Sequence, residues 1–246
     1  MVAQPPLIDG TWARVDACDL TVCTWHWPLA AERRQAIDAD WRARKAQTPG
    51  LFNGAVYLFR DFAIAGGRLT GTLFRSDFKT LLYWRSLDGK AAGSVKEASG
   101  ASLIRAADRH LLYGRQAPNQ LNSGLVYPPS GVIDGSDVFG EVVDIDAHIA
   151  RELEEETGLT AADLQRVPGY VVALDGRHVA IGVEWRSAQP AETARRSIMG
   201  FLGAQTEPEL DDIVIVRAPA AIAEHKMPPH ARIFARALLS AGTSES

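Results

Sequence analysis

The sequence predicts an α/β or α+β protein, a sandwich of helices packed around a mixed sheet. Segments in which apolar and polar residues alternate indicate strands, and segments with apolar residues at helical spacing indicate helices. The two kinds of segment alternate along the chain, and several of the predicted strands also follow one another directly. This order is typical of a mixed sheet that is covered by helices.

The N-terminal part is expected to hold strands, one long helix, a hairpin and a short helix. Pro28 begins the long helix, and the TPG sequence at 48–50 ends it. Ile37 and Trp41 have helical spacing within it, and the glycine pair at 66–67 predicts the turn of the hairpin. In order, the predicted elements are one or two strands within residues 1–27, a helix over 28–47, strands over 55–64 and 68–76, and a helix over 77–86.

The rest of the chain continues with strands, helices and two loops. Asp108 and Arg109 form a predicted turn between two strands. A glycine- and proline-rich segment over 121–137 predicts a loop. The other predicted elements are strands over 101–107 and 110–115, a helix over 144–157, strands over 169–174 and 178–186, a helix over 190–200, a loop over 203–212, a strand over 213–218 and a helix over 230–241.

Composition and charge restrict the classes of function. The chain has 246 residues, enough for one large domain or for a domain with an additional module. Its net charge of −4 argues against nucleic acid or an anionic membrane as a partner. Residues 1–10 lack the regions of a signal peptide, and no apolar run approaches the roughly 18 residues of a membrane span. Cys18 and Cys23 lack metal-ligand spacing and suit a reducing compartment, so a soluble cytoplasmic protein is expected.

The helix predicted over 144–157 has a clear buried side and a clear end. Ile145, Ile149 and Leu153 recur every four residues and form its buried stripe. Gly158 stands where a left-handed residue commonly ends a helix. The helix is therefore expected to pack through this stripe and to end at the glycine.

Three glutamates in the last turn of this helix form a candidate metal site. Glu152, Glu155 and Glu156 are related as i, i+3 and i+4, so their carboxylates gather on one side, whereas Glu154 points elsewhere. Negative charge here opposes the helix macrodipole by about 0.3–1 kcal/mol per charge, and like charges at i, i+4 cost about 0.2–0.5 kcal/mol more. Clustered carboxylate oxygens instead suit Mg²⁺ or Mn²⁺, which offsets the repulsion. A solvated acidic surface, partly neutralised by Arg151, is the alternative.

The string RELEEETGL, residues 151–159, matches the second half of the Nudix box. The family pattern is G-x5-E-x7-R-E-U-x-E-E-x-G-U, with U an aliphatic residue, and every specified position of the second half is present. The chain therefore resembles the Nudix hydrolase superfamily in the segment that carries its acidic cluster.

The first half of the box is interrupted. The segment PPSGVIDGSD is similar to it, with Ser130 in place of the first glycine. Gly131 leads by five residues to Asp137, which stands where the family has glutamate. From Asp137 to Arg151 there are 13 intervening residues instead of seven, and Glu141 is a second candidate for the acidic position.

Two further stretches, residues 41–54 and 70–84, resemble a branch of Nudix proteins that hydrolyses nucleoside diphosphate sugars such as UDP-glucose and UDP-galactose. Members of that branch carry an N-terminal extension and an expanded box. The resemblance implies a Nudix fold, an α/β/α sandwich around a mixed sheet. It divides the chain into an N-terminal extension over 1–95, a Nudix hydrolase domain over 96–240 and a disordered tail over 241–246.

The resemblance also implies a set of site residues. Members cleave a diphosphate linked to another moiety, using water and Mg²⁺ or Mn²⁺. Glu152 would also orient or deprotonate water, and Arg151 would hold the carboxylates through an ion pair. The candidates are Glu152, Arg151 and Glu209 for catalysis; Glu152, Glu155 and Glu156 for the metal; and Ser130, Gly131, Phe74 and Arg75 for substrate binding, with ordinary packing as the alternative for the last two.

A second acidic group is expected from the loop over 203–212. Glu209 lies just before the last predicted strand and is favoured as a supplementary base or ligand over Glu207, Asp211 and Asp212. A solvated loop charge is the alternative. Glu184, in the strand over 178–186, is expected to form a structural salt bridge, and the six histidines lack the HExxH spacing of a zinc site.

The expected activity is Mg²⁺-dependent hydrolysis of a nucleoside diphosphate sugar to a nucleoside monophosphate and a sugar 1-phosphate. The alternatives are the same chemistry on ADP-ribose or another nucleoside diphosphate compound, and a catalytically silent domain that senses a nucleotide. The expected partner is a small-molecule nucleotide, and a homodimer is compatible with the sequence.

Overall fold

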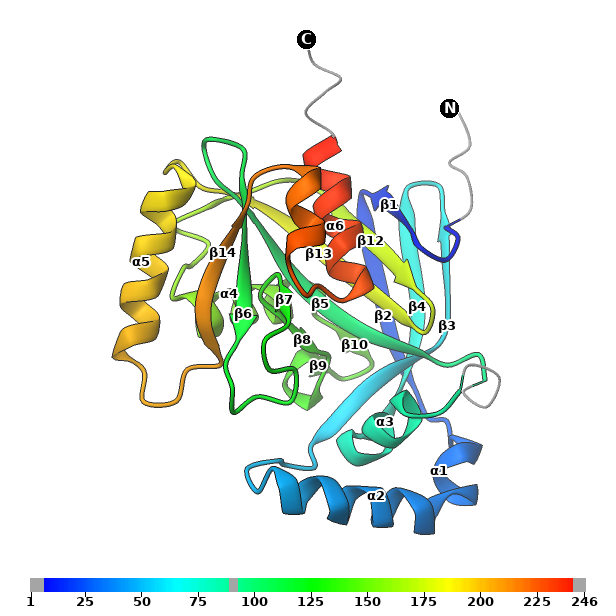
Figure 1. Ribbon diagram of the computed structural model, residues 1–246. Helices are drawn as coiled ribbons and strands as arrows, with labels where there is room; N and C mark the ends of the chain where they lie inside the picture. The colour runs from blue at the N-terminus through cyan, green and yellow to red at the C-terminus, as the bar shows by residue number, and fades with distance from the viewer. Residues whose placement is uncertain (1–6, 89–92, 241–246) are drawn as a thin grey trace.

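The computed structural model describes residues 7–88 and 93–240, which form strands and helices in the order of Figure 1. The strands are β1 (Thr11–Val15), β2 (Ala17–Cys23), β3 (Ala55–Ala65), β4 (Arg68–Asp77), β5 (Lys96–Arg105), β6 (Leu111–Gln116), β7 (Val126–Tyr127), β8 (Ser130–Val132), β9 (Val138–Phe139), β10 (Val142–Val143), β11 (Gln165–Arg166), β12 (Tyr170–Asp175), β13 (His178–Arg186) and β14 (Leu210–Val216). The helices are α1 (Pro28–Glu32), α2 (Arg34–Gln47), α3 (Phe78–Arg85), α4 (Ile145–Thr157), α5 (Ala191–Ala204) and α6 (Pro229–Ser240), with 3₁₀ helices η2 (Gly135–Asp137) and η3 (Pro219–Glu224). In this described part of the chain, none of the helices has the length and apolar character needed to cross a membrane.

One mixed sheet joins the strands. Its main path runs β1-β12-β13-β5-β3-β4-β2-β10-β9, and β6, β7, β8, β11 and β14 pair beside this path. The pairs β13–β5 and β2–β4 are parallel, whereas hairpins such as β12–β13 are antiparallel. The predicted mixed sheet is therefore confirmed.

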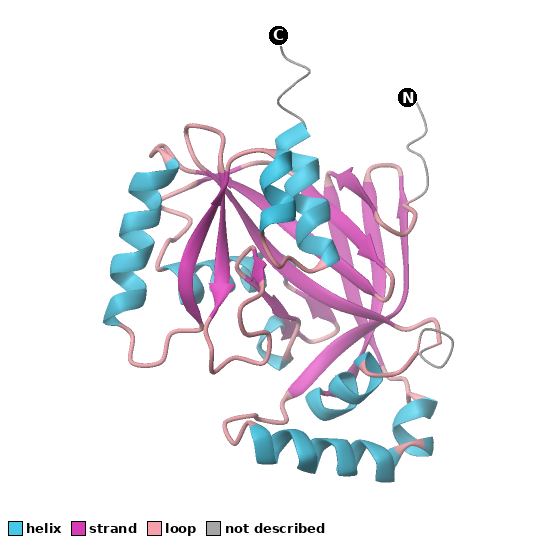
Figure 2. Cartoon of the chain, viewed as in Figure 1, coloured by secondary structure: helices cyan, strands magenta, loops and turns pink. Residues whose placement is uncertain are grey.

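Helices cover both faces of the central strands (Figure 2). On one face, Ile149 of α4 and Ile198 of α5 belong to the same apolar cluster as Ile181 of β13. On the other face, Phe234 of α6 belongs to a cluster with Ala180 of β13. Neighbouring residues of a strand point to opposite faces, which places Ala180 and Ile181 in different layers. The arrangement is an α/β/α sandwich, as predicted.

The N-terminal residues contribute strands to this same sheet. β1 pairs with β12, and β3 pairs with β5. Helices α1, α2 and α3 lie together at one end of the molecule (Figure 1), where Trp84 of α3 belongs to an aromatic cluster with Trp27 and Phe74. The domain boundary between residues 95 and 96 stays a prediction, and the tail predicted over 241–246 lies outside the described residues.

The structure differs from the predicted elements at several places; for example, the strand predicted over 101–107 is β5, which begins at Lys96, and the helix predicted over 190–200 is α5, which continues to Ala204. The helix predicted over 28–47 is broken at Arg33, whose φ and ψ are −108° and 13°. The loop predicted over 121–137 contains β7, β8 and η2, which are too short to produce a periodic pattern. The last strand begins at Leu210 instead of 213, because the buried Leu210 pairs with Gln116 of β6.

Candidate functional site

Helix α4 holds the predicted glutamates in a fixed orientation against the sheet. The carboxylate of Asp144 caps its N-terminus by accepting a hydrogen bond from the backbone N–H of Ala147 at 2.9 Å. Gly158 ends it with a φ of 69°, the left-handed conformation expected there. Ile149 and Leu153 are fully buried in the core. The predicted stripe and the predicted end of the helix are both confirmed.

Glu156 is a buried carboxylate with one unsatisfied oxygen. Only 4% of the residue is exposed. Its Oε1 accepts a hydrogen bond from the backbone N–H of Ser130 at 3.0 Å, whereas Oε2 has no hydrogen-bond partner among the described residues. A buried carboxylate oxygen without a partner is costly unless a proton or a cation binds it. This oxygen therefore fits the role of a metal ligand.

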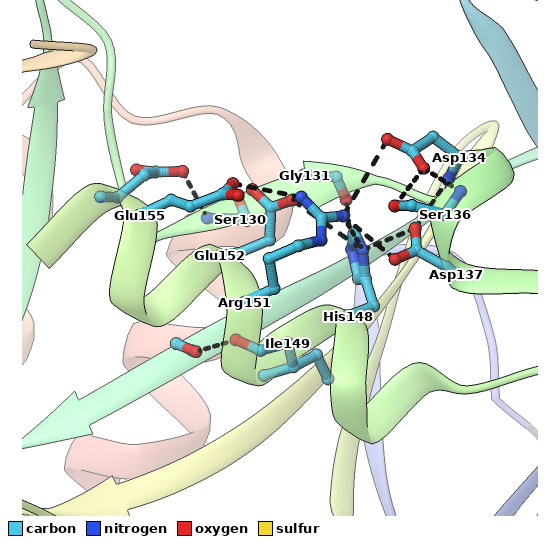
Figure 3. A network of polar contacts seen from close by, with 12 residues as sticks. Ser130, Gly131, Asp134, Ser136, Asp137, His148, Ile149, Arg151, Glu152 and Glu155 are labelled. Atoms are coloured by element: carbon cyan, nitrogen blue, oxygen red, sulfur yellow. Dashed lines mark hydrogen bonds and ion pairs between the residues drawn. The ribbon is translucent and has the colours of Figure 1, made fainter. Parts of the chain in front are cut away.

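Strand β8 brings its backbone against Glu152. A Cβ atom on Gly131 would lie 2.5 Å from Cδ of the Glu152 carboxylate, so this approach requires glycine. Figure 3 shows Glu152 beside Ser130 and Gly131, with Glu155 farther along α4. Ser130 and Gly131 thus meet two of the predicted metal ligands through backbone atoms.

Burial and mutual repulsion raise the pKa of two of these glutamates. Burial is the main cause of the raised pKa of Glu156, and the charges of Glu152 and Glu209 add to it. Burial also raises the pKa of Glu152, although the positive charges of His148 and Arg151 act in the opposite direction. A raised carboxyl pKa means that the site favours a bound proton or a bound cation over free negative charge.

Arg151 joins the glutamates to the first half of the box. Its Nη1 lies 2.9 Å from Oε1 of Glu152 and 3.1 Å from Oε2 of Glu155. Its Nη2 donates a hydrogen bond to Oδ1 of Asp137 at 3.0 Å (Figure 3). One guanidinium group therefore holds three carboxylates, in the positioning role that was predicted for it.

Asp137, and not Glu141, is the acidic residue that reaches this network. Asp137 is buried at the end of η2, where its Oδ2 accepts a hydrogen bond from the backbone N–H of Asp134 at 2.8 Å. Glu141 is exposed on the turn that follows. Burial alone would raise the pKa of Asp137, but hydrogen bonds, first from His148, hold that pKa below its usual range. The additional residues of the box therefore form β9, β10 and their turn without displacing Asp137 from Arg151.

His148 is a part of the network that the sequence analysis missed. The residue is completely buried, and its Nδ1 lies 2.9 Å from Oδ2 of Asp137. Its Nε2 lies 3.1 Å from the carbonyl oxygen of Gly131. Both ring nitrogens therefore face acceptors, and although burial favours the neutral ring, Asp137 raises the pKa of His148. Gly100 of β5 leaves the space for this ring, because a Cβ there would lie 2.4 Å from its Cδ2.

A signal for His148 was present in the sequence. It precedes Arg151 by three positions and Glu152 by four, so all three lie on one side of α4. A search for zinc-protease spacing does not find it, because its partners are a distant aspartate and a backbone carbonyl.

The three predicted metal ligands and Glu209 line one cavity of about 550 Å³. The other lining residues come from the loop after α5, and they include Gln205 and Glu207. The backbone carbonyl of Glu209 accepts a hydrogen bond from Ala117 at 2.8 Å, which fixes the loop beside β6. Burial, and next the charge of Glu155, raises the pKa of Glu209. The structure therefore brings Glu209 to the predicted site.

Three of the other acidic candidates have structural partners. Asp211 and Asp212 form ion pairs with Arg115, and Asp212 also pairs with Arg195 at 2.5 Å. The buried Glu184 lies within ion-pair distance of three arginines, Arg14, Arg105 and Arg186. The salt bridge predicted for Glu184 is thus present.

Two predicted substrate residues lie away from the glutamates. Phe74 is completely buried and packs against Trp25 and Trp27, with ring centroids 4.6 and 5.5 Å away. Its prediction as a substrate contact is wrong for a side chain with no exposed surface. Arg75 is exposed and lines a different cavity, of about 650 Å³, which shares no lining residue with the glutamate cavity.

Ser130 and Gly131 line a third cavity, of about 260 Å³, which we name the polar cavity for the hydrogen-bonding side chains among its mixed polar and apolar lining. Its walls include Glu97, which accepts a hydrogen bond from Nε of Arg85 at 2.9 Å, and Ser99. The cavity also contains the side chains of Asn122, Tyr127, His178 and His230. The segment 130–131 thus has the buried glutamates beside it and also borders a polar cavity.

No protein-family model matches the chain, and no curated protein matches it. Among solved structures, it is similar to RenU, a Nudix hydrolase from M. smegmatis, with 18% identity over 61% of this chain and 89% of that chain and a TM-score of 0.39. It is also similar to the NUDIX domain of Shewanella oneidensis NrtR complexed with ADP ribose, with 16% identity, coverage of 64% and 95%, and a TM-score of 0.37. A third similar structure is a bifunctional NMN adenylyltransferase/ADP ribose pyrophosphatase from Francisella tularensis complexed with AMP and Mn ion, with 17% identity, coverage of 65% and 46%, and a TM-score of 0.42. At these identities and TM-scores the matches do not decide the function, which is inferred from the residues of the site.

Proposed function

We propose that this protein is a metal-dependent hydrolase of the Nudix type, which cleaves the diphosphate linkage of a nucleoside diphosphate sugar. The observation that carries the proposal is the buried Glu156, whose Oε2 has no partner among the described residues. Glu156 belongs to the string RELEEETGL, which matches the second half of the Nudix box. The neighbouring Gly131 has no side chain and so leaves room for the Glu152 carboxylate.

Glu152, Glu155 and Glu156 would hold Mg²⁺ or Mn²⁺. Carboxylate oxygens are the ligands that these hard cations prefer, and the three side chains line one cavity. A bound cation neutralises negative charge on the diphosphate as its bond breaks.

The residues around the glutamates position them and handle protons. Arg151 and the pair formed by Asp137 and His148 fix the orientation of Glu152. Glu209 lines the same cavity and has a raised pKa, which makes it a stronger base than an ordinary carboxylate. We assign Glu209 the role of supplementary base that accepts a proton from the attacking water.

The polar cavity bordered by Ser130 and Gly131 supports a sugar as the second moiety of the substrate. Its Ser99, Asn122 and Glu97 side chains offer donors and acceptors for hydroxyl groups, and its volume is about 260 Å³. A substrate whose diphosphate contacts the glutamates would place its sugar in this cavity. UDP-glucose is the representative compound.

A substrate panel tests the proposal. The purified protein is incubated with UDP-glucose, an ADP-sugar and ADP-ribose, each with Mg²⁺ or with EDTA, and the released phosphomonoesters are measured. We expect Mg²⁺-dependent conversion of UDP-glucose to UMP and glucose 1-phosphate. Turnover of ADP-ribose alone would reject the sugar nucleotide, and the absence of metal-dependent turnover on every compound would favour a nucleotide sensor.

A further inference from the structure

A second cluster of ligand-type side chains lies where β12, β13 and α6 meet. Asp175 ends β12, His178 begins β13, and His230 is the second residue of α6. One ligand atom from each residue lies within 4.8 Å of the others. None of the three lines the glutamate cavity. The cluster is therefore separate from the site of the proposed hydrolysis.

The backbone fixes two members of the cluster relative to each other. Asp175 and His178 stand directly opposite in the antiparallel pair, on either side of the turn at Gly176. Gly176 has a φ of 53°, which suits a tight turn, and its N–H donates to the Asp9 carboxylate. His230 comes from a different element, and its ring lies edge-on to that of His178 with centroids 4.5 Å apart. Two rigid elements thus bring the three side chains together.

The donor set is that of a transition-metal site and differs from the glutamate triad. Two imidazoles and one carboxylate suit Zn²⁺, which takes three protein ligands and leaves a fourth position open in catalytic sites. Ligands at about 2.1 Å from a tetrahedral ion lie roughly 3.4 Å apart, so the observed spacing closes with small side-chain rotations. Free imidazole is mostly neutral at pH 7.5, the form that binds metal.

The surroundings of the cluster also fit a cation. Ser99 Oγ lies 2.7 Å from Nε2 of His178 and fixes the ring, as outer-shell partners do for metal-binding histidines. Two positive charges lie near the cluster: Arg85 is neutralised by its two hydrogen bonds to Glu97, and the ammonium group of Lys96 donates to the backbone carbonyl of Gly176 at 2.6 Å. Within residues 7–88 and 93–240, no arginine or lysine forms an ion pair with Asp175. Its negative charge is therefore available to a cation.

We propose that Asp175, His178 and His230 form a second metal site, selective for Zn²⁺ over Mg²⁺. His178 and His230 also line the polar cavity bordered by Ser130 and Gly131. The proposed ion therefore lies at the wall of the cavity that we assign to the sugar, and it does not depend on the glutamates.

Zinc binding by the full-length protein tests this site without any assay of activity. The protein is stripped with a chelator, dialysed against Zn²⁺ in excess Mg²⁺, and its retained zinc is measured. We expect one retained Zn²⁺ per chain in the unaltered protein and in Glu156→Gln. His178→Gln and His230→Gln are expected to weaken Zn²⁺ binding by about 100-fold or more. Loss of a residue that only hydrogen-bonds a ligand typically weakens metal binding by about 10–100-fold. His26→Gln, which alters an exposed histidine, is the matched control.

Co²⁺ absorption separates loss of the site from loss of the fold. Co²⁺ in the unaltered protein should show the visible bands of a tetrahedral site, and Ser99→Ala should weaken its binding by about 10–100-fold while the circular dichroism stays unchanged. Asp175→Asn, of nearly the same shape, should also weaken binding in a folded protein. The proposal is overturned if the unaltered protein retains no Zn²⁺, if the histidine variants bind it as before, or if Glu156→Gln removes it.

Discussion

Nδ1 of His148 lies 2.9 Å from Oδ2 of Asp137, and both residues are buried between α4 and the 3₁₀ helix that precedes β9. This contact connects the two halves of the interrupted box. Asp137 also binds Arg151, and the guanidinium group of Arg151 pairs with Glu152 and Glu155. The interruption therefore lengthens the chain without breaking the network.

Removing the charge of Asp137 should destabilise the protein strongly. The buried Asp137 carboxylate contacts both Arg151 and His148, and losing a hydrogen bond to a charged group typically costs about 1.5–3 kcal/mol. We expect Asp137→Asn to lower the free energy of unfolding by about this amount in chemical denaturation. Glu192→Gln is the control, since Glu192 and its partner Arg217 are both exposed, and its effect should be small. Equal effects of the two substitutions would contradict the assigned role of Asp137.

Stability should fall in acid because of Glu97. Arg85 and the two nearby histidines overcome the effect of burial and lower the pKa of Glu97 from 4.5 to about 2. A depressed carboxyl pKa contributes stability that is fully present above 4.5 and is lost as the pH falls toward 2. Unfolding measured between pH 5 and pH 2 should therefore show a steeper loss in the unaltered protein than in Glu97→Gln. Parallel curves would show that Glu97 does not provide this dependence.

Mg²⁺ binding should release protons and strengthen as the pH rises. The pKa of Glu156 is raised well above its usual value, chiefly by burial, so the metal-free protein keeps the proton of this carboxyl to a higher pH than usual, and a bound cation competes with that proton. Calorimetric titration in two buffers of different ionisation enthalpy should report this release. Glu156→Gln should abolish it, whereas Glu154→Gln, on the same helix but exposed, should not. The same proton release in both variants would contradict the assignment.

A side chain at position 131 should displace the Glu152 carboxylate from its position in the site. In Gly131→Ala the new Cβ would meet the Glu152 carboxylate at 2.5 Å, so Glu152 must move and turnover should fall by at least an order of magnitude. Gly135→Ala is the matched control, because a Cβ there meets no atom within 4 Å. Steady-state rates of the two variants, with Mg²⁺ in excess, make the comparison. An active Gly131→Ala protein would show that the close approach of β8 is unimportant.

The part of the site that depends on local geometry could be predicted from the sequence. The spacing of Glu152, Glu155 and Glu156 fixes their common direction as soon as the segment is helical. The choice of Asp137 over Glu141 could not be made in this way, because it depends on how η2 packs against α4. The recruitment of Glu209 from a distant loop was predicted, and the structure places it at the same cavity.

Other residues required the three-dimensional structure. The alternation of apolar and polar residues places Phe74 on the apolar face of its strand. It does not predict whether that face is exposed or is covered by helices and tryptophans, as it is here. His178 and His230 are far apart in the sequence, and only the docking of α6 beside the β12–β13 hairpin joins them. The long-range contacts that decide these cases leave no periodic signal in the chain.

The most direct test of the central claim is the rate of UDP-glucose hydrolysis by Glu156→Gln, compared with Glu154→Gln, at saturating Mg²⁺. If the buried carboxylate is a ligand of the metal that hydrolysis requires, Glu156→Gln should lose orders of magnitude in kcat while remaining folded. Glu154→Gln should retain the rate of the unaltered protein. An unchanged rate in a folded Glu156→Gln protein would contradict the account.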